Sequence, residues 1–300
     1  MQRNILFTVV IPTYNRAGFI KNTVQGFLNQ TYSNFEIIIV DDGSTDNTEE
    51  VAAGMVNDKV KYFKKANAER GAARNFGLMK AAGDYVNFFD SDDIAYPNHL
   101  QTAFETITKF DSPEIFTLGY DLKTPEGVVL AVHNTFDRNT VEYAIKKKKV
   151  SINALFVRTD VAKDIRFSEN RLLSASEDAL FLCLLCARYP LHYNNTITST
   201  ILEHDSRSMA VASEQQLLNR KNYFLEGLRA DHVFMAKYGQ HVDEIEREMD
   251  YLLTLSCLIN KENDKATNYF KAYLKGTPLS ILHFRTLVFL KKYVKNLVKS

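Results

Sequence analysis

The sequence has few cysteines, no excess of either charge and no long apolar run. Three cysteines among 300 residues do not suggest a disulfide framework, and a reducing cytoplasm fits them. Lys and Arg number 37 and Asp and Glu number 36, which gives a net charge of +1. This balance gives no bulk electrostatic reason to expect nucleic acid as a partner.

No window reaches the roughly 18 to 20 apolar residues of a membrane span. The apolar stretch that begins at Ile5 is too short for a signal peptide and lacks a small-residue cleavage site. These absences predict a soluble, cytoplasmic protein, with attachment to the inner face of the cell membrane left open. Cys183 and Cys186 lie in an apolar run without Gly or Pro, which predicts small core residues on a buried helix.

Apolar, β-branched runs alternate with amphipathic stretches over the first ninety residues. The runs predict buried strands at residues 5–11, 36–40, 60–63 and 84–89. Pro12 should end the first strand, and Asn15 should cap the helix that follows. Thr45 or Asp46 should cap a second, short helix, and a third is expected over 71–82. Such alternation predicts an α/β fold with a doubly wound, mostly parallel sheet and right-handed crossovers.

The pattern loosens after Pro97. We expect further strands at 114–122, 128–133 and 153–157, and a helix at 176–188. Beyond about Ser208 the chain is predicted to be mostly helical. The expected organisation is a domain over 1–207, with halves at 1–95 and 96–207, followed by a helical region over 208–300.

The acidic run Asp90-Ser91-Asp92-Asp93 follows the fourth predicted strand. Three carboxylates this close repel one another unless a cation or strong donors neutralise them. Mg²⁺ or Mn²⁺ bound together with a nucleoside diphosphate would do so. An acidic loop that caps the next helix is the alternative.

Two more polar clusters follow neighbouring predicted strands. Pro12-Thr13-Tyr14 offers an aromatic face for a base together with a hydroxyl, and Asp41 can accept the imide hydrogen of uracil. Ligands of parallel α/β sheets bind beyond the carboxyl ends of the strands. We therefore expect these clusters and the acidic run to converge on one site.

Four segments together resemble the family 2 inverting glycosyltransferases of the GT-A fold. They are Val9-Val-Ile-Pro-Thr-Tyr-Asn-Arg16, Val40-Asp-Asp-Gly-Ser-Thr-Asp-Asn-Thr48, Arg70-Gly-Ala-Ala-Arg-Asn-Phe-Gly77 and Phe88-Phe-Asp-Ser-Asp-Asp93. The match is dense over residues 5–95 and thins to scattered signals up to about residue 208. The resemblance implies a nucleotide-sugar-binding half at 1–95 and an acceptor half at 96–207.

The resemblance also implies roles for single residues. Pro12, Thr13, Tyr14 and Asp41 would line the base pocket of the nucleotide sugar. Arg70 and Arg74 would lie on the segment that closes over the nucleotide. Asp90, with Ser91 beside it, would reach the ribose or the metal, Asp92 would be the main metal ligand, and Asp93 would belong to the acceptor side or be structural.

Inversion by a single displacement needs a carboxylate that takes the proton of the acceptor hydroxyl. Glu177-Asp178 at a predicted helix start resembles the family's Glu-Asp pair, whose Asp is the base. Two acids that compensate the helix dipole are the alternative. His204 resembles a family histidine that approaches the diphosphate or metal, although a lone histidine is more often structural.

Two rival functions stay open. A haloacid-dehalogenase-like phosphohydrolase also uses an Asp-x-Asp motif at a strand end, but normally on its first strand. A non-catalytic nucleotide-binding relic of the same fold would keep the fold without the chemistry. A dinucleotide dehydrogenase is excluded, because no Gly-x-Gly-x-x-Gly follows the first strand.

Residues 279–300 carry four Lys and one Arg among apolar residues and contain no acid. Such a helix can lie on an anionic membrane, dock on the protein's own core, or hold a homodimer together. The function expected from the whole sequence is metal-dependent transfer of a hexose or N-acetylhexosamine from a nucleoside diphosphate, with UDP favoured. The acceptor would be a glycan or lipid-linked glycan in polysaccharide biosynthesis.

Overall fold

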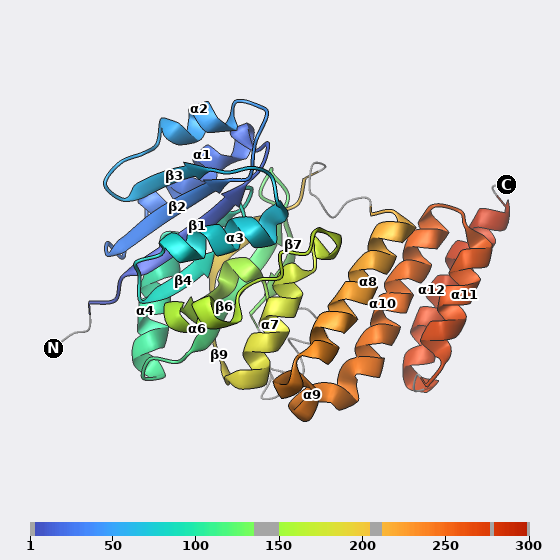
Figure 1. Cartoon of the computed structure of the whole chain (residues 1–300). Coiled ribbons are helices and arrows are strands. Elements are labelled where there is room, and N and C mark those ends of the chain that lie inside the picture. The colour runs from blue at the N-terminus through green and yellow to red at the C-terminus, as the bar shows by residue number, and fades with distance from the viewer. Residues whose placement is uncertain (1–3, 135–149, 205–211, 277–278, 299–300) are drawn as a thin grey trace. The chain divides into compact units, whose positions relative to one another are not determined.

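The computed structural model describes residues 4–134, 150–204, 212–276 and 279–298. The chain forms two compact units, Met1–Arg207 and Ser208–Ser300. The first is an α/β unit and the second is helical (Figure 1).

One mixed sheet forms the centre of the first unit. Its strands within the described residues are β1 (Phe7–Thr13), β2 (Phe35–Asp41), β3 (Val60–Lys64), β4 (Tyr85–Phe88), β5 (Ile94–Ala95), β6 (Ile115–Lys123), β7 (Val129–His133), β8 (Leu155–Arg158) and β9 (Leu191–Leu202). The order is β3-β2-β1-β4-β8-β6-β9-β5, and β7 pairs with β6. Strands β1 to β4 are parallel to one another, as predicted. Strand β8 is antiparallel to β4 and β6, and β6 is parallel to β9.

The prediction that Pro12 ends the first strand is wrong. Pro12 lies beside Val40 and Thr13 beside Asp41 in the parallel register, so β1 continues through Thr13. The apolar residues of β1 and β2 are fully buried, as expected of strands covered on both faces. Strands β1 and β2 therefore end level with each other, and their following loops start side by side.

Helices cover both faces of this sheet. They are α1 (Ala17–Leu28), α2 (Thr48–Ala53), α3 (Glu69–Lys80), α4 (His99–Lys109), α6 (Thr159–Ile165) and α7 (Glu177–Arg188). Side chains of α1, α2 and α4 pack in one core with one face of the sheet. Side chains of α3, α6 and α7 pack in a second core with the other face, and these three helices lie in front of the sheet in Figure 1. Cys183 and Cys186 are buried in α7, as predicted.

A buried histidine joins the two halves of the sheet. His99 Nδ1 lies 2.9 Å from Thr198 Oγ1 on β9, and Nε2 lies 3.3 Å from Asn87 Oδ1 on β4. Asn87 in turn donates hydrogen bonds to the main chain of the segment that leads into β8. Burial lowers the pKa of His99 to about 3.

Folding should therefore weaken below neutral pH in a way that depends on His99. Its folded pKa lies below the unfolded value of about 6.5, so the unfolded state takes up the proton first as the pH falls. This contribution is present in full above about pH 6.5 and is lost as the pH falls toward 3. Between pH 6.5 and 5 the loss is about 2 kcal/mol. Urea unfolding of wild type and His99→Gln at both pH values measures it, and equal losses in both proteins would contradict this role.

The second unit is a bundle of antiparallel helices. They are α8 (Glu214–Ala230), α9 (His232–Tyr238), α10 (Val242–Ile259), α11 (Asn263–Leu274) and α12 (Leu279–Val298). Helix α8 begins with a full capping box, in which Ser213 and Gln216 each satisfy the other's main-chain N–H. Aromatic side chains of α10, α11 and α12 form the core of this unit. None of the helices that the structure describes is long and apolar enough to cross a membrane.

Candidate active site

The loops after β1 and β2 are tied together by Asn15. Its Oδ1 accepts the N–H of Thr45 at 2.9 Å, and its own N–H donates to Ser44 Oγ at 2.9 Å. Asn15 has φ 51°, a left-handed conformation that asparagine tolerates better than most residues. The prediction that Asn15 caps α1 is therefore wrong. Helix α1 starts at Ala17 without a side-chain cap, and Asn15 holds the two loops together instead.

Asp41 is fully buried and holds the turn that follows β2. Its Oδ1 accepts the N–H of Ser44 at 2.7 Å, and its Oδ2 accepts the hydroxyl of Tyr62 at 2.8 Å. Burial and this hydrogen bond raise the pKa of Tyr62. Asp41 thus supports the turn after β2 through these two hydrogen bonds, and its contact with a base stays a prediction.

Pro12, Thr13 and Tyr14 differ in their exposure. Pro12 and Thr13 are buried at the end of β1, whereas Tyr14 is 47% exposed. Thr13 Oγ1 is buried and has no hydrogen-bond partner among the described residues. A buried hydroxyl without a partner is rare in folded proteins, so Thr13 stays a candidate for a ligand contact.

The acidic run forms a tight turn in which each residue has its own surroundings. Asp90 is partly exposed, and its Oδ1 lies 2.9 Å from Arg74 Nη2. Ser91 is buried, and its carbonyl accepts the hydroxyl of Thr23 at 2.9 Å. Asp93 is also buried and accepts two hydrogen bonds from the protein.

Asp92 is the member of this turn that faces other candidate site residues. Its Oδ2 lies 3.3 Å from Arg16 Nε and 3.4 Å from His204 Nε2. The imidazole of His204 stacks on Phe19, with ring centroids 4.6 Å apart. The loops after β1, β4 and β9 therefore meet at Asp92, as the sequence predicted for β1 and β4.

Arg74 is buried between two carboxylates. Its Nη1 lies 2.6 Å from Glu177 Oε1, while Nη2 reaches Asp90, and its side chain is only 1% exposed. Burial lowers the pKa of Arg74, but the Asp90 and Glu177 carboxylates more than offset this effect. The guanidinium of Arg74 therefore links the acidic turn to α7. Arg70 stays partly exposed, with Nε 3.9 Å from Glu177 Oε1.

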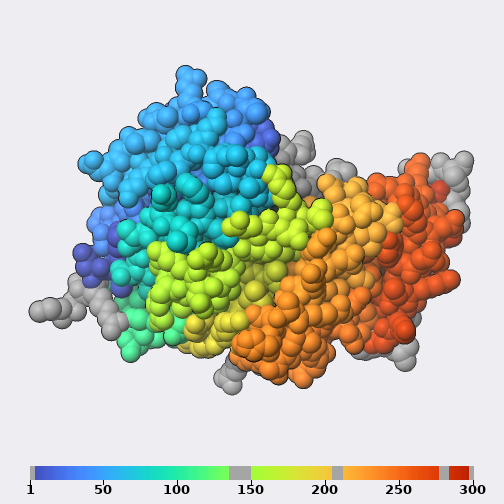
Figure 2. Space-filling model, in the orientation of Figure 1, coloured from blue at the N-terminus to red at the C-terminus, as the bar shows by residue number. Residues whose placement is uncertain are grey.

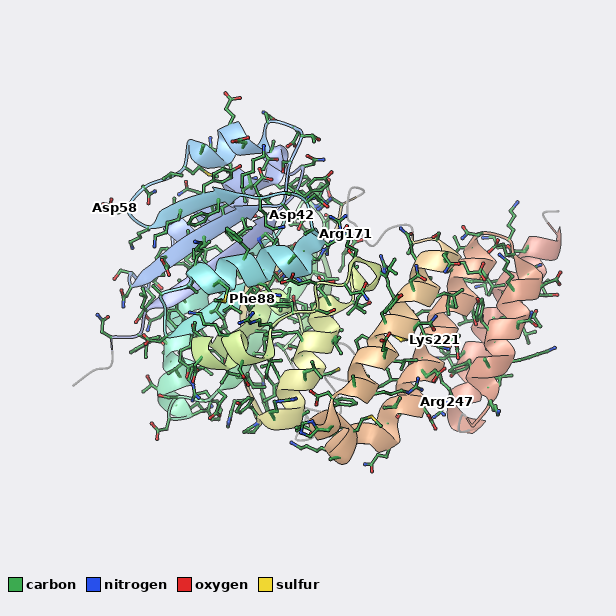
Figure 3. The ribbon with its side chains drawn as sticks, in the orientation of Figure 1. Asp42, Asp58, Phe88, Arg171, Lys221 and Arg247 are labelled. Carbon is green, nitrogen blue, oxygen red and sulfur yellow. The ribbon has the colours of Figure 1, made fainter. Side chains whose placement is uncertain are left out.

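Further contacts bring the start of α7 to the start of α3. Arg171 donates a hydrogen bond to the carbonyl of Asn67, and Ser174 Oγ donates to Glu69 Oε2 at 2.8 Å. At the same end of α3, Asp42 accepts the N–H of Ala68 at 3.0 Å. Figure 3 labels Asp42 and Arg171 at this end of α3, and Figure 2 shows the yellow-green surface of residues 150–190 beside the cyan surface of α3. The segment that precedes Asp178 is thus fixed next to the start of α3 and the loop that follows β2.

Asp178 and Glu177 open α7 but differ in surroundings. Asp178 is partly exposed, and its Oδ1 accepts the N–H of Ala179 at 2.8 Å. Glu177 is buried, and burial raises the pKa of its carboxyl while Arg74 opposes the rise. Glu177 Oε2 has no hydrogen-bond partner within the described residues. One acid is therefore accessible to substrate, and the other presents an unsatisfied acceptor beside it.

The residues around Asp92 fit a divalent cation that arrives with a diphosphate. In the part of the chain that the structure describes, no three His, Cys, Asp or Glu side chains form a preformed metal site. A carboxylate oxygen and an imidazole nitrogen 3.4 Å apart are nevertheless two suitable donors. Mg²⁺ is commonly held by one or two protein carboxylates, with phosphate oxygens and water completing its coordination.

Three residues of this site had no role in the sequence-based prediction. Arg16 pairs with Asp92, Glu177 pairs with Arg74, and Asn153 donates to Asp93. Arg16 is the last residue of a motif segment that the resemblance covers, and this position was a usable signal. The only sequence signal for Asn153 was its position as a polar residue at the start of an apolar run.

Solved structures of similar fold place the first unit in a known class. TarS 1–349 of S. aureus, solved in complex with UDP-GlcNAc, aligns with a TM-score of 0.66 and 20% identity, covering 96% of this chain and 89% of that chain. The mannosyltransferase PcManGT of Pyrobaculum calidifontis, in complex with GDP-Man and Mn²⁺, aligns at 0.57 and 15%, covering 98% and 86%. The fold is that of GT-A glycosyltransferases, as predicted.

Sequence comparisons give the family. A family model described as glycosyl transferase family 2 matches residues 8–153. An uncharacterized glycosyltransferase of Haemophilus influenzae is 39% identical over 201 residues, which are 65% of this chain and 78% of that protein. The chain belongs to glycosyl transferase family 2. Other curated relatives, from Rickettsia and Streptococcus pneumoniae, match over 118 to 127 residues, and the chain spans only 18 to 42% of their length.

Proposed function

We propose that the chain transfers a hexose or N-acetylhexosamine from UDP to a hydroxyl of a glycan or lipid-linked glycan, with inversion at the anomeric carbon. Polysaccharide assembly is the proposed setting. The observation that carries this proposal is the buried Arg74, which joins Asp90 of the acidic turn to Glu177 beside Asp178. It brings a nucleotide-side carboxylate and a candidate base into one site. Residues 1–207 would form the catalytic domain, with donor half 1–95 and acceptor half 96–207, and 208–300 the helical appendage.

The donor nucleotide would bind at the ends of β1 and β4. The exposed ring of Tyr14 can pack on the base, and the unpartnered hydroxyl of Thr13 can bind its edge. Asp90 can accept a ribose hydroxyl, and Arg70 can reach a phosphate. Support for UDP comes from TarS, whose complexes hold UDP and UDP-GlcNAc.

Asp92, with Asp90 and His204, would hold Mn²⁺ or Mg²⁺ against the diphosphate. The bound cation would stabilise the negative charge that develops on the departing diphosphate. Arg16 pairs with Asp92 at 3.3 Å, and it could turn to the phosphates where a cation takes its place beside this carboxylate. The Mn²⁺ complex of PcManGT supports this cofactor class.

Asp178 would act as the general base. The acceptor oxygen forms a bond to the anomeric carbon as the bond from that carbon to the diphosphate oxygen breaks. The acceptor's proton passes to the Asp178 carboxylate, and the diphosphate leaves with the bonding pair. Attack from the face opposite the leaving group inverts the anomeric configuration. Glu177 Oε2 can accept a hydrogen bond from a hydroxyl of the bound sugar.

Family membership removes the haloacid-dehalogenase alternative, and a binding relic remains as the competitor. A thermal-shift screen of nucleotide sugars with Mn²⁺ tests the proposal. A UDP-sugar should raise the melting temperature most, and release of UDP over time should follow in the same mixture. Stabilisation without any UDP release, with water or added glycans as acceptor, would favour the relic.

The C-terminal helix supports a membrane contact for a cytoplasmic enzyme. Its inner face packs on the bundle through Phe289, which stacks on Phe270 at 4.1 Å. Its other side exposes Phe284, Leu287, Leu290 and Val294, and Lys291 and Lys295 lie exposed along it. We propose that this stripe rests on an anionic membrane surface.

A chain that ends at Thr277 should therefore lose sedimentation with vesicles that contain anionic lipid. Wild-type protein should sediment with these vesicles at low salt and much less with neutral ones, because lysine attraction to anionic lipid is screened by salt. Leu287→Ser/Leu290→Ser keeps every charge and should also bind weakly. Equal sedimentation of wild type and truncated chain would contradict the membrane contact, and a truncated chain that changes from dimer to monomer would assign the stripe to a homodimer.

A further inference from the structure

Two donors near Asp92 come from segments far apart in the sequence. Asp92 lies in the turn between β4 and β5, and His204 follows the last residue of β9 by two positions. Their side chains nevertheless lie 3.4 Å apart. The relative positions of these two segments must be fixed by other contacts, because a metal site tolerates little error in the placement of its donors.

Asp93 provides the direct link between the two segments. Its Oδ1 accepts the N–H of Leu202, the last residue of β9, at 2.9 Å. Strands β5 and β9 pair through Ile94 and Thr200, so the side chain of Asp93 extends this pairing toward His204. The hydrogen bond fixes the end of β9 to the residue next to Asp92.

Asn153 holds the other side of the same carboxylate. Its Nδ2 donates to Asp93 Oδ2 at 2.6 Å, and its Oδ1 accepts the N–H of Asp90 at 2.9 Å. Asn153 is 1% exposed, and its carbonyl accepts a hydrogen bond from Asn87. The side chain of Asn153 thus forms hydrogen bonds with the first and last residues of the acidic turn. The hydroxyl of Thr23 on α1 also donates to the turn, at the carbonyls of Ser91 and Asp93.

We propose that Asn153 and Asp93 are positioning residues that set the distance between Asp92 and His204 for a divalent cation. They do not touch the cation, and they act by holding the donors on two segments in place. This inference rests on the proposed function, since it concerns the cation that the donor diphosphate brings. Outer-shell partners of metal ligands commonly change metal affinity by about 10- to 100-fold when they are removed.

The pair offers an exchange that preserves the hydrogen bonds. Asp93→Asn alone places two side-chain amides opposite each other, where an amide now donates to a carboxylate. Asn153→Asp alone places two carboxylates opposite each other, and neither can donate. In the double variant Asp93→Asn/Asn153→Asp, the carboxylate at position 153 accepts hydrogen bonds from the Asp90 N–H and from the amide N–H at position 93. The amide oxygen at position 93 accepts the Leu202 N–H. The three hydrogen bonds return, and the net charge equals that of wild type.

Titration of Mn²⁺ into protein saturated with UDP, followed by calorimetry, tests the proposal. Both single variants should bind Mn²⁺ about 10- to 100-fold more weakly, and the double variant should return to within about threefold of wild type. Asn153→Asp is decisive, because the added negative charge alone would strengthen cation binding. Wild-type or tighter Mn²⁺ affinity in that variant would overturn the proposal.

A control separates positioning from general destabilisation. Glu36 lies near the start of β2, where its carboxylate accepts hydrogen bonds from Thr8 and Ala82. Glu36→Gln should lower the melting temperature without changing the affinity for Mn²⁺. If a single variant fails to fold, the double variant decides: recovered folding with wild-type Mn²⁺ affinity supports the proposal, and recovered folding with weak affinity contradicts it. A wild-type protein that binds no Mn²⁺ with UDP would instead refute the proposed function together with this inference.

Discussion

Asp178→Asn should lower the rate of sugar transfer by about 10²- to 10⁴-fold and leave UDP binding unchanged. The amide keeps the shape of the side chain but cannot take the acceptor's proton. Asp178 is partly exposed at the start of α7, and its Oδ1 accepts the N–H of Ala179, a hydrogen bond that the amide oxygen of asparagine can also accept. Single-turnover measurements with saturating donor give the rate of the chemical step, and calorimetry gives the affinity for UDP.

Asp160 offers a matched control for Asp178. It also lies in the first turn of a helix, α6, and it pairs with Arg158 at the surface. If Asp178 served only to compensate the helix dipole, each substitution would cost about 0.3 to 1 kcal/mol of stability and neither would affect transfer. Transfer by Asp178→Asn at the rate of Asp160→Asn would remove Asp178 from the mechanism.

Asp92→Ala should abolish the strengthening of UDP binding by Mn²⁺. We expect a loss of about 3 kcal/mol, or roughly 100-fold in affinity, in the presence of the cation. Binding of UDP in the presence of EDTA should not weaken, because removal of Asp92 releases Arg16 and leaves more positive charge for the diphosphate. The two effects point in opposite directions, so a general loss of folding cannot imitate them.

Asp84→Asn is the corresponding control. Asp84 precedes the same strand, β4, at its opposite end, where its carboxylate accepts the N–H of Leu6. This variant should keep the full effect of Mn²⁺ on UDP binding. A similar loss in both variants would mean that Asp92 acts through the stability of β4 rather than through a cation.

The sequence was sufficient to predict the parallel half of the sheet. Strands β1, β2 and β4 are mostly apolar, and the order of β1 to β4 along the chain matches the repeated strand–helix pattern. The second half is different, since β8 lies between β4 and β6 and is antiparallel to both. Such pairing depends on contacts between distant segments, which no local periodicity reports.

The acidic turn shows which features of the site could not be predicted from the sequence. The motif singled out Asp90 and Asp92, and in the structure Asp92 lies 3.4 Å from His204. A motif cannot tell a side chain that faces a ligand from one that supports its neighbours. Asp41 and Arg74 are charged and look like ligand contacts in the sequence, yet both are buried and bind protein partners in the folded chain. Their roles depend on Tyr62 and Glu177, which approach only in the folded chain.

The most direct test of the central claim is a titration of UDP into the wild-type protein with Mn²⁺ and again with EDTA. The claim is that the acidic turn, His204 and the start of α7 form one site for a nucleoside diphosphate and a divalent cation. It predicts saturable binding of one UDP per chain, at least about tenfold tighter with Mn²⁺, which corresponds to about 1.4 kcal/mol. Equal affinity in Mn²⁺ and EDTA, or no binding of UDP in either, would contradict it.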